Sequence, residues 1–353
     1  MFPTLGHGCQ YNRQVKTAAN FAYIAGDYAV EPSVSPQSQG SAEEHEERRR
    51  VFWLAYTVDR HLALSHNRPL DILDAQCEVF SPLPDNLWQT IDTLGMESLQ
   101  LRTYGPPMTI SGTGFFEYSL PIVAILGDII DFRLRRYHPR LVSNDDASLE
   151  VIKANLTHCE RSLCQLSDTQ NLSHSPSGTP LQRSTAKMVV AYAVYIIKVR
   201  YVLVYGNWDA IAMLEGDGDW ITSSMFAKCS SSSIAAAQAL SDILRVDPEL
   251  SFMPYLFGIY LFHGSFVLLL FAERMSRIGP NPSVEEACEV IIRAHEVAIV
   301  TLSTEFQAIL RKAFRSLLYN ARRSELSEAE LQTLRKEVLS TYRWTMGHRG
   351  LCL

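Results

Sequence analysis

Apolar residues recur with the period of an α-helix along most of this chain, and that pattern limits the fold more than any other feature. One stripe follows Ser283 and consists of Ala287, Ile291, Ala294, Ala298, Leu302, Phe306, Leu310, Phe314 and Leu318. A second stripe follows Ser327 and consists of Leu331, Leu334, Val338 and Tyr342. This spacing places the apolar side chains on one helix face, whereas no stretch shows the sustained period-two alternation of a strand. The sequence therefore predicts an all-α protein.

Two sequence signals predict where these helices begin. Ser283-x-x-Glu286 and Ser327-x-x-Glu330 have the spacing of capping boxes, in which the serine hydroxyl and the glutamate each bind a backbone amide of the first turn. Both precede the apolar stripes, so we predict packing helices that begin at these serines.

Composition narrows the class of protein. The chain has 353 residues, of which 47% are hydrophobic and 20% charged, enough to bury one large core or two ordinary ones. Its formal net charge of −6 argues against binding nucleic acid through the overall field of the chain. The first residues, "MFPTLGHGCQYNRQ", show no targeting pattern, and the seven scattered cysteines indicate reduced intracellular thiols.

Two stretches rich in Pro, Ser and Gly divide the chain. Residues 30–47 and 168–182 have the composition of linkers or loops. We therefore predict an N-terminal segment and linker over 1–42, a first helical half over 43–167, a loop over 168–182 and a second helical half over 183–353.

The segment "SFMPYLFGIYLFHGSFVLLLF", residues 251–271, has the length and composition of a membrane span. Its acidic and basic flanks show no one-sided basic excess, and it contains Pro254, Gly258, His263 and Gly264. We predict a buried central helix and no membrane contact.

No motif for catalysis or metal binding reaches the required spacing. His61 and His66 are five residues apart and point in different directions on one helix, while His158, Cys159 and Cys164 lack a fourth ligand. "SGTGFFE" at 111–117 lacks the third glycine of a phosphate loop, and "GDGDW" at 216–220 lacks the remaining calcium ligands. Asp128 and Asp131 alone do not make the aspartate-rich motif of a helical terpenoid-type enzyme. The sequence predicts neither an enzyme, nor a catalytic site, nor a cofactor or metal site.

The segment from Glu43 to Ile72 predicts a buried helix with charges inside it. Glu46 and Glu47 lie four and three residues before Arg50, where the side chains can pair along the helix. Asp59 and Arg60 stand in an otherwise apolar stretch and must find partners within the fold. Pro69 ends the helix, because a proline disfavours the helical conformation of the residue before it.

At these residues the chain resembles a known family. "ERRRVFWLAYTVDRHLALSHNRPL" is similar to the regulatory, or middle homology, region of fungal binuclear zinc-cluster transcription factors, with the pattern Arg-Arg-x-Phe/Trp-Trp, then Asp-Arg, then Arg-Pro. Within that family it resembles the xylanolytic activators and their arabinanolytic relatives. Other matching blocks are "GFFEYSLPIVAILGDIID", "DPELSFMPYLFGIYLFHGSFVLLL", "RAHEVAIVTLSTEFQAILRKAFRSLL" and the terminal "YRWT". The residues that the resemblance marks as structural or regulatory are Arg49, Arg50, Trp53, Asp59, Arg60, Arg68, Pro69, Tyr342, Arg343 and Trp344.

The chain departs from the family pattern in two places. It has no Cys-x-x-Cys pair, so the family's two zinc ions and its DNA contact are expected only in an N-terminal module that this sequence lacks. His66 stands where most of the family has glycine two residues before the Arg-Pro pair, which leaves the geometry of that turn open.

The resemblance implies a function. It implies the helical regulatory domain of a nuclear activator of xylanolytic, hemicellulose-degrading and pentose-catabolic genes. The implied partners are a small sugar-derived inducer, a coactivator or repressor, and a second copy of the chain, with DNA contacted only through the missing module. The alternative is a corepressor-like protein that binds a full-length activator without binding DNA.

The C-terminal tail, "LQTLRKEVLSTYRWTMGHRGLCL", keeps apolar residues to its end, namely Trp344, Leu351 and Leu353. A tail that extends into solvent rarely carries so much apolar surface. We therefore predict that it folds back onto the helix from Val284 to Leu318 and acts as a movable latch.

Overall fold

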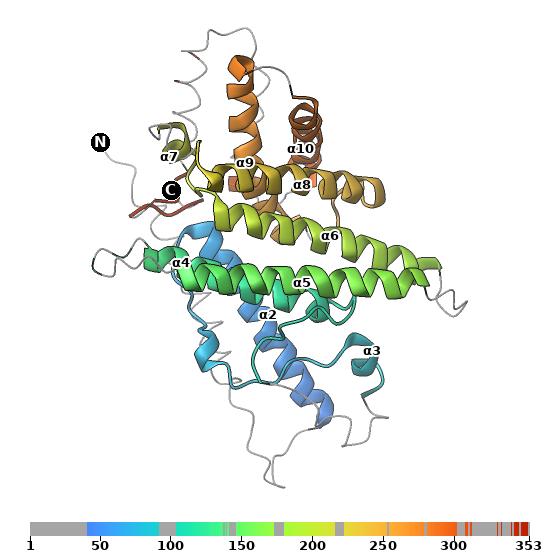
Figure 1. The fold of residues 1–353 in the computed structure, drawn as a ribbon. Helices are drawn as coiled ribbons and strands as arrows, with labels where there is room; N and C mark the ends of the chain where they lie inside the picture. The colour runs from blue at the N-terminus through green and yellow to red at the C-terminus, as the bar shows by residue number, and fades with distance from the viewer. Residues whose placement is uncertain are drawn as a thin grey trace, which may run out of the picture. The chain divides into compact units, whose positions relative to one another are not determined.

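The computed structural model describes the chain at residues 41–91, 104–136, 138, 140, 146–172, 180–215, 222–252, 254–278, 281–301, 308–309, 311–312, 330, 333, 340, 342–345 and 347–351. Every named element in these residues is a helix, which confirms the all-α prediction (Figure 1). The elements are α2 Ala42–His66, η1 Asp74–Gln76, α3 Asp85–Trp88, α4 Phe115–Arg136, α5 Asp146–Leu172, α6 Pro180–Tyr205, α7 Ala210–Glu215, α8 Ser224–Val246, α9 Pro254–Ile278 and α10 Pro282–Thr301.

The chain divides into two compact units. Among the described residues, the first unit holds 41–64, 68–140 and 157–169, and the second holds 65–67, 146–156 and 170–351. The helix α5 continues to Leu172, so it extends into the segment that the composition had suggested to be a loop. Residues 173–179 of that segment, and most of 1–42, lie outside the described part.

The first unit is organised by α2 and α4. A capping box begins α2, since the Ser41 hydroxyl accepts from the Glu44 amide at 3.1 Å and the Glu44 carboxylate accepts from the Ser41 amide at 3.2 Å. The apolar core between α2, α4 and the connecting loop consists of Phe52, Trp53, Ala55, Tyr56, Ile72, Cys77, Val79, Phe116, Leu120 and Val123.

Pro121 lies inside α4, where it has no amide to donate to the carbonyl of Glu117. That carbonyl accepts instead from the amide of Ser111 at 3.3 Å, in the segment that leads into the helix. The proline therefore leaves no unsatisfied acceptor at Glu117 and ties the preceding turn to α4.

The second unit is a stack of long helices. In Figure 1, α6 and α8 lie alongside one another and α9 runs across them. The helix α9 contacts both, and α10 packs against α8 and α9. The described part of the apolar segment 251–271 is buried, with Phe257, Leu261 and Phe262 at most 1% exposed, as predicted for a core helix. The stretch Ser184–Tyr205 of α6 is also long and apolar enough to cross a membrane, but 61% of it is buried inside the protein, which is typical of a core helix.

Polar side chains within this stack are paired across helices. The Ser265 hydroxyl on α9 and the ring Nε2 of His295 on α10 lie 2.8 Å apart. Burial lowers the pKa of His295 to about 3, so the ring is neutral at physiological pH. The pair joins two helices without placing a charge in the core.

The helix α10 begins two residues earlier than the predicted capping box at Ser283 implies. Pro282 is its first residue, and Asn281 takes the cap position, because its side-chain oxygen accepts from the Ser283 amide at 3.1 Å. Proline is common at the first helical position, where its missing amide is not needed. The prediction of Ser283 as the cap is therefore wrong, and the second predicted capping box, at Ser327, lies in a segment that is outside the described residues except for Glu330.

Candidate functional site

Asp59 is the centre of a buried charge network in the first unit. Asp59 is only 5% exposed, and its carboxylate accepts hydrogen bonds from Arg68 at 2.9 Å and from Arg60 at 3.2 Å. It also accepts from the backbone amides of Asp71 and Ile72, each at 3.2 Å. With these donors from the helix and from the loop, the Asp59 carboxylate holds the loop after α2 against the helix.

Arg60 is fully buried, and its guanidinium is compensated from two sides. It donates to Asp74 at 2.6 Å and lies 3.3 Å from the centre of the Tyr56 ring. The Tyr56 hydroxyl also donates to Asp74, at 2.8 Å. A Cβ at Gly127 of α4 would lie 3.3 Å from Arg60 Nε, so the glycine leaves room for the buried arginine. Arg60 therefore links α2, η1 and α4.

Arg68 and Pro69 form the turn that closes the network. Arg68 also donates to the Asp71 carboxylate at 2.8 Å and to the Pro69 carbonyl at 2.9 Å, while Pro69 itself is exposed. The left-handed residue of this turn is Asn67, with φ of 49°, and the Arg68 amide donates to the Ala63 carbonyl at 3.1 Å. This is a helix C-terminus of the Schellman type, in which asparagine substitutes for glycine. His66 keeps a helical conformation, which settles the turn geometry that the sequence had left open.

Carboxylates outnumber the arginines around this network. Asp128 and Asp131 on α4 lie near Asp74, and burial together with the charges of Asp74 and Asp131 raises the pKa of Asp128 to about 6. The pKa of Asp131 is also raised by burial, although Arg135 and Arg60 oppose the shift. Asp128 therefore titrates near the lower end of the physiological range, unlike an ordinary aspartate.

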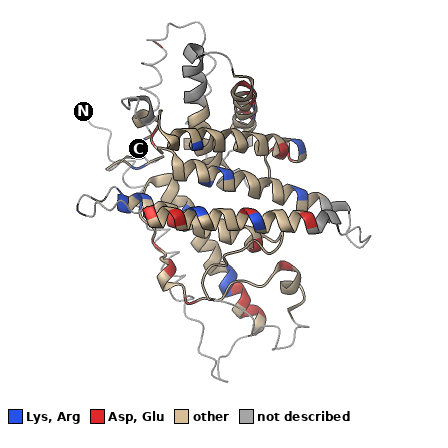
Figure 2. Ribbon diagram, in the orientation of Figure 1, with Lys and Arg blue, Asp and Glu red and all other residues tan. Residues whose placement is uncertain are grey.

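The arginines at the start of α2 hold the loop that leads to α3. Arg50 donates to the Asp85 carboxylate at 2.9 Å and to the Leu83 carbonyl at 2.8 Å, and Glu46 accepts from the Leu83 amide at 2.6 Å. Arg49 pairs with Glu46 at 3.4 Å. The Trp53 indole donates to the Phe80 carbonyl at 2.8 Å. Figure 2 shows the acidic and basic residues of this first part of α2 next to one another.

The tail residues Tyr342, Arg343 and Trp344 form a second site, in the second unit. Arg343 Nε donates to both oxygens of Asp209, at 3.0 Å and 2.8 Å, and the Trp344 amide donates to the same carboxylate at 2.7 Å. Asp209 is fully buried and also accepts from the Ala212 amide at 2.8 Å. One carboxylate thus fastens the tail to the start of α7.

Apolar contacts and backbone hydrogen bonds complete the docking of the tail. Trp344 is fully buried, and its ring lies 4.9 Å from His263 and 5.2 Å from Phe262 of α9. Asn67 donates to the carbonyls of Thr345 and His348 at 3.0 Å and 2.9 Å, and the Leu351 amide donates to the Ser65 carbonyl at 2.9 Å. These partners lie at the start of α7, on α9 and at the end of α2. The predicted docking of the tail on the helix from Val284 to Leu318 stays a prediction, because most of residues 302–318 lie outside the described part.

Gly350 is needed at the point where the tail meets α2. Its φ is +58°, a backbone conformation that L side chains rarely adopt. A Cβ there would also overlap the Ser65 carbonyl oxygen. Only glycine satisfies both conditions.

Several residues of these two sites were not predicted. Asp74 and Asp209 carry no sequence signal beyond being aspartates. Glu46 pairs along the helix with Arg49 and Arg50, as predicted, and its contact with the Leu83 amide in the loop is an addition. The described residues contain no group of three or more His, Cys, Asp or Glu side chains placed to hold a metal ion. The contacts that the structure describes at these two sites position a loop and dock the tail.

The sequence comparison defines the class of protein. The "Fungal specific transcription factor domain" matches residues 7–156, a range that includes α2 and the whole Asp59 network. Over these residues the chain is similar to the regulatory domain of fungal transcription factors.

Individual relatives narrow the class further. The chain is 41% identical over 348 residues to "Xylanolytic transcriptional activator xlnR" of Aspergillus clavatus, and 42% identical over 344 residues to the protein of that name from Emericella nidulans. Each alignment covers 88% of this chain and 35% or 38% of the relative, so the chain spans little more than a third of the relatives it matches. The protein of the same name from Aspergillus kawachii is 39% identical over 90% of this chain. No solved structure matches the chain.

Proposed function

We propose that this chain is the regulatory region of a fungal activator of genes for xylan breakdown and pentose catabolism, and that it acts in the nucleus. The observation that carries the proposal is 39–42% identity to xylanolytic activators over 88–90% of the chain. DNA would be contacted through a separate zinc-cluster module, because the chain itself has no Cys-x-x-Cys pair.

A chimera tests this function. The chain is joined to an unrelated DNA-binding module, and a reporter gene controlled by that module is measured with and without sugars released from xylan. We expect transcription that rises when the sugars are present. A chimera that is folded and abundant but gives the same reporter signal in both media would refute the proposal.

The same sugars test whether the chain senses an inducer directly. A ligand that binds only the folded state raises the melting temperature by mass action. We expect a sugar from xylan to raise it and a matched sugar alcohol to leave it unchanged. If no such sugar shifts the transition while the chimera still responds, the inducer acts through a partner protein.

The docked tail supports a regulatory role for the second site. Its polar attachment includes hydrogen bonds to the Asp209 carboxylate and the Ser65 carbonyl and from the Asn67 side-chain amide, and none of these partners belongs to the Asp59 network. We expect truncation after Thr341 to change the ratio of induced to uninduced transcription in the chimera. Arg343→Ala should change the ratio in the same direction, because it removes the charge-assisted hydrogen bonds to Asp209. An unchanged ratio at equal protein abundance would mean that the tail only packs.

We also propose that the chain holds no stoichiometric zinc. Cys77, Cys159, Cys229 and Cys288 are buried in separate places, and burial raises the pKa of the Cys159 thiol to about 12, which opposes the thiolate that zinc requires. Elemental analysis of the purified chain should find no bound zinc, and two zinc ions per chain would contradict the proposal.

A further inference from the structure

Three lysines and two tyrosines gather on one surface of the second unit. They come from three helices and are Lys153 of α5, Lys198, Tyr201 and Tyr205 of α6, and Lys228 of α8. Lys228 is exposed and the other four are half-buried. In Figure 2, basic residues appear on all three helices at the end where α6 finishes and α8 begins. We call this surface the lysine–tyrosine patch, and it is separate from the residues of the Asp59 network and of the tail-docking site.

The two tyrosine rings hold the ammonium groups of the patch. Lys153 Nζ lies 5.7 Å and Lys228 Nζ 5.6 Å from the centre of the Tyr205 ring. Lys198 Nζ lies 5.8 Å from the centre of the Tyr201 ring, which is stacked on Tyr205 with the ring centres 6.2 Å apart. The face of an aromatic ring attracts cations, so the two rings keep three positive charges close together on one surface.

The patch is basic in a chain that is acidic overall. The chain has 38 Asp and Glu against 32 Lys and Arg, yet the sequence of α6 contains no acidic residue and that of α8 none before Asp242. Lys153 pairs with the exposed Glu150 at 2.6 Å, whereas Lys228 forms no ion pair within the part of the chain that the structure describes. An exposed ammonium group of this kind, next to a second lysine, attracts a partner that supplies carboxylates.

The spacing of the patch suits several carboxylates along a peptide. In an extended peptide, side chains two positions apart lie on the same face and roughly 7 Å from each other. The two ring centres are 6.2 Å apart, so alternate glutamates of such a peptide reach the ammonium groups over both rings. The half-buried rings of Tyr201 and Tyr205 offer a flat apolar floor for the methylene groups of those side chains.

A nucleic acid fits this surface less well. Proteins that bind DNA commonly neutralise many phosphates at once, and the patch supplies three lysines. The net charge of −6 on the whole chain also repels a long polyanion that extends beyond the patch, but has less effect on a short acidic segment.

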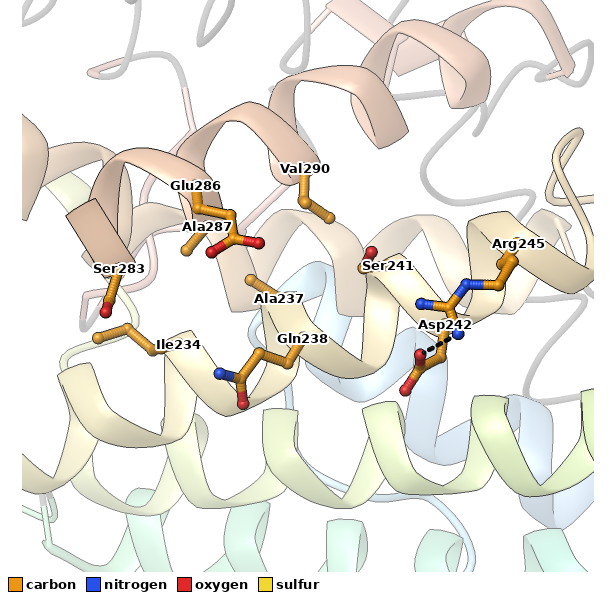
Figure 3. A pocket seen from close by; sticks show the side chains of 10 residues that line it. All are labelled: Ile234, Ala237, Gln238, Ser241, Asp242, Arg245, Ser283, Glu286, Ala287 and Val290. Atoms are coloured by element: carbon orange, nitrogen blue, oxygen red, sulfur yellow. Dashed lines mark ion pairs between the residues drawn. The ribbon is translucent and has the colours of Figure 1, made fainter.

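The groove between α8 and α10 has the opposite balance of charge. This hollow, of about 240 Å³, is lined by Asp242 and Arg245 of α8 and by Glu286 of α10, among others. Figure 3 shows Arg245 pointing to Asp242, and their ion pair measures 3.0 Å. With two acidic side chains to one basic side chain, the groove gives an acidic segment less attraction than the lysine–tyrosine patch does.

We propose that the lysine–tyrosine patch binds an acidic segment of another protein, in an extended conformation and with carboxylates at alternate positions. One carboxylate contacts Lys153 and Lys228 beside Tyr205, and the next contacts Lys198 beside Tyr201. Such docking does not depend on which genes the protein regulates, so it stands apart from the function proposed above.

Two synthetic peptides test the proposal. In a short labelled peptide glutamate alternates with serine, and in its control glutamine replaces every glutamate. Binding to the purified full chain is measured by fluorescence anisotropy at low and at high salt. We expect the glutamate peptide to bind at least about tenfold more tightly, and its advantage to fall as the salt concentration rises, because exposed charges are screened. Equal binding of the two peptides at low salt would overturn the proposal.

Variants of the chain locate the binding site. Lys228→Glu should weaken binding of the glutamate peptide at least about fivefold, whereas Lys228→Arg should keep it within about twofold, because only the first change removes the positive charge. Lys187→Glu makes the same charge change at an exposed lysine near the other end of α6 and should leave binding unchanged. Unchanged melting temperatures would show that each variant folds. Equal weakening by Lys187→Glu and Lys228→Glu would mean that only the overall charge matters, and would overturn the proposed site.

Competitors distinguish an acidic peptide from other occupants. At equal ionic strength, inorganic phosphate should displace the glutamate peptide no better than chloride does, and an unrelated DNA duplex should not displace it. Stronger displacement by phosphate would assign the patch to a small anion, and displacement by DNA would assign it to a nucleic acid. Either result would overturn the proposal.

Discussion

Asp59 and Asp209 perform the same chemistry in different settings. Each is a buried aspartate that accepts from an arginine and from backbone amides. The partners of Asp59 lie within 13 residues of it, whereas Arg343 is 134 residues from Asp209. The local network forms as soon as α2 and its loop fold, while the distant pair must first close a long loop. The first is therefore suited to a scaffold and the second to a contact that can be made and released.

The two sites also differ in charge balance. Arg343 and Asp209 form a one-to-one pair, whereas Asp59, Asp74, Asp128 and Asp131 surround two arginines of the first unit. The excess of carboxylates makes the first site sensitive to pH. The described contacts of the second site show no such excess of carboxylates.

The largest expected effect comes from breaking the local network. Asp59→Ala leaves the buried Arg60 and the Asp71 and Ile72 amides without their shared acceptor, and should lower the free energy of unfolding by about 3–5 kcal/mol. Chemical denaturation of the purified variant measures it. Asp71→Ala is a matched control, because that exposed carboxylate contacts Arg68 only at the surface, and should cost below about 1 kcal/mol. Equal losses of unfolding free energy in the two variants would show that Asp59 is not the centre of the network.

Breaking the distant pair should have a smaller effect. Arg343→Ala removes the charge-assisted hydrogen bonds to Asp209 and should lower the free energy of unfolding by about 1.5–3 kcal/mol. Limited proteolysis should also cut the tail of this variant faster, while sites in the first unit keep their natural rate. Arg349→Ala, at an exposed position of the same tail, serves as the control. Tail cleavage at the natural rate in Arg343→Ala would show that the apolar contacts of Trp344 suffice.

Packing in the second unit can be tested apart from its charges. A Cβ at Gly264 would lie 3.0 Å from the Tyr195 hydroxyl and 3.1 Å from a Val199 methyl, so Gly264→Leu must displace α6 from α9. We expect a loss of about 1–3 kcal/mol in the free energy of unfolding. An unchanged melting temperature would contradict the burial of this helix.

The smallest expected effect comes from removing one of the excess carboxylates of the first site, Asp128. Because the folded pKa of Asp128, about 6, lies above its ordinary value of 3.8, its contribution to stability is fully present below about pH 4 and is lost as the pH rises through 6. Asp128→Asn should therefore raise the free energy of unfolding at pH 7 by about 1–2 kcal/mol and flatten its decline between pH 4 and 7. Denaturation at several pH values checks both, and a variant less stable than the natural chain at pH 7 would reverse the assigned sign.

Local signals in the sequence predicted much of the first unit. The charge run, the apolar block and Pro69 predicted α2 and its end, and the position of Asp59 and Arg60 in that block predicted that both needed partners inside the fold. The Ser41-x-x-Glu44 capping box is a local signal of the same kind at the start of α2. At the start of α10, Asn281 and Pro282 form a signal as good as that of Ser283, so the local sequence does not choose between the two.

What the sequence by itself determined is the set of properties that depend on neighbours along the chain: the all-α class, the helix α2 with its terminating turn, and an apolar tail that must be covered. Tertiary structure alone decided which aspartate receives Arg343, on which helices Trp344 docks, and that α8 and α10 leave a groove between them. The physical reason is range. Helical periodicity and helix caps depend on residues a few positions apart, so they can be recognised in a short stretch of sequence. A pair such as Asp209 and Arg343 depends on the packing of all the helices between them, and every other aspartate in the chain offers the same chemistry until that packing is known.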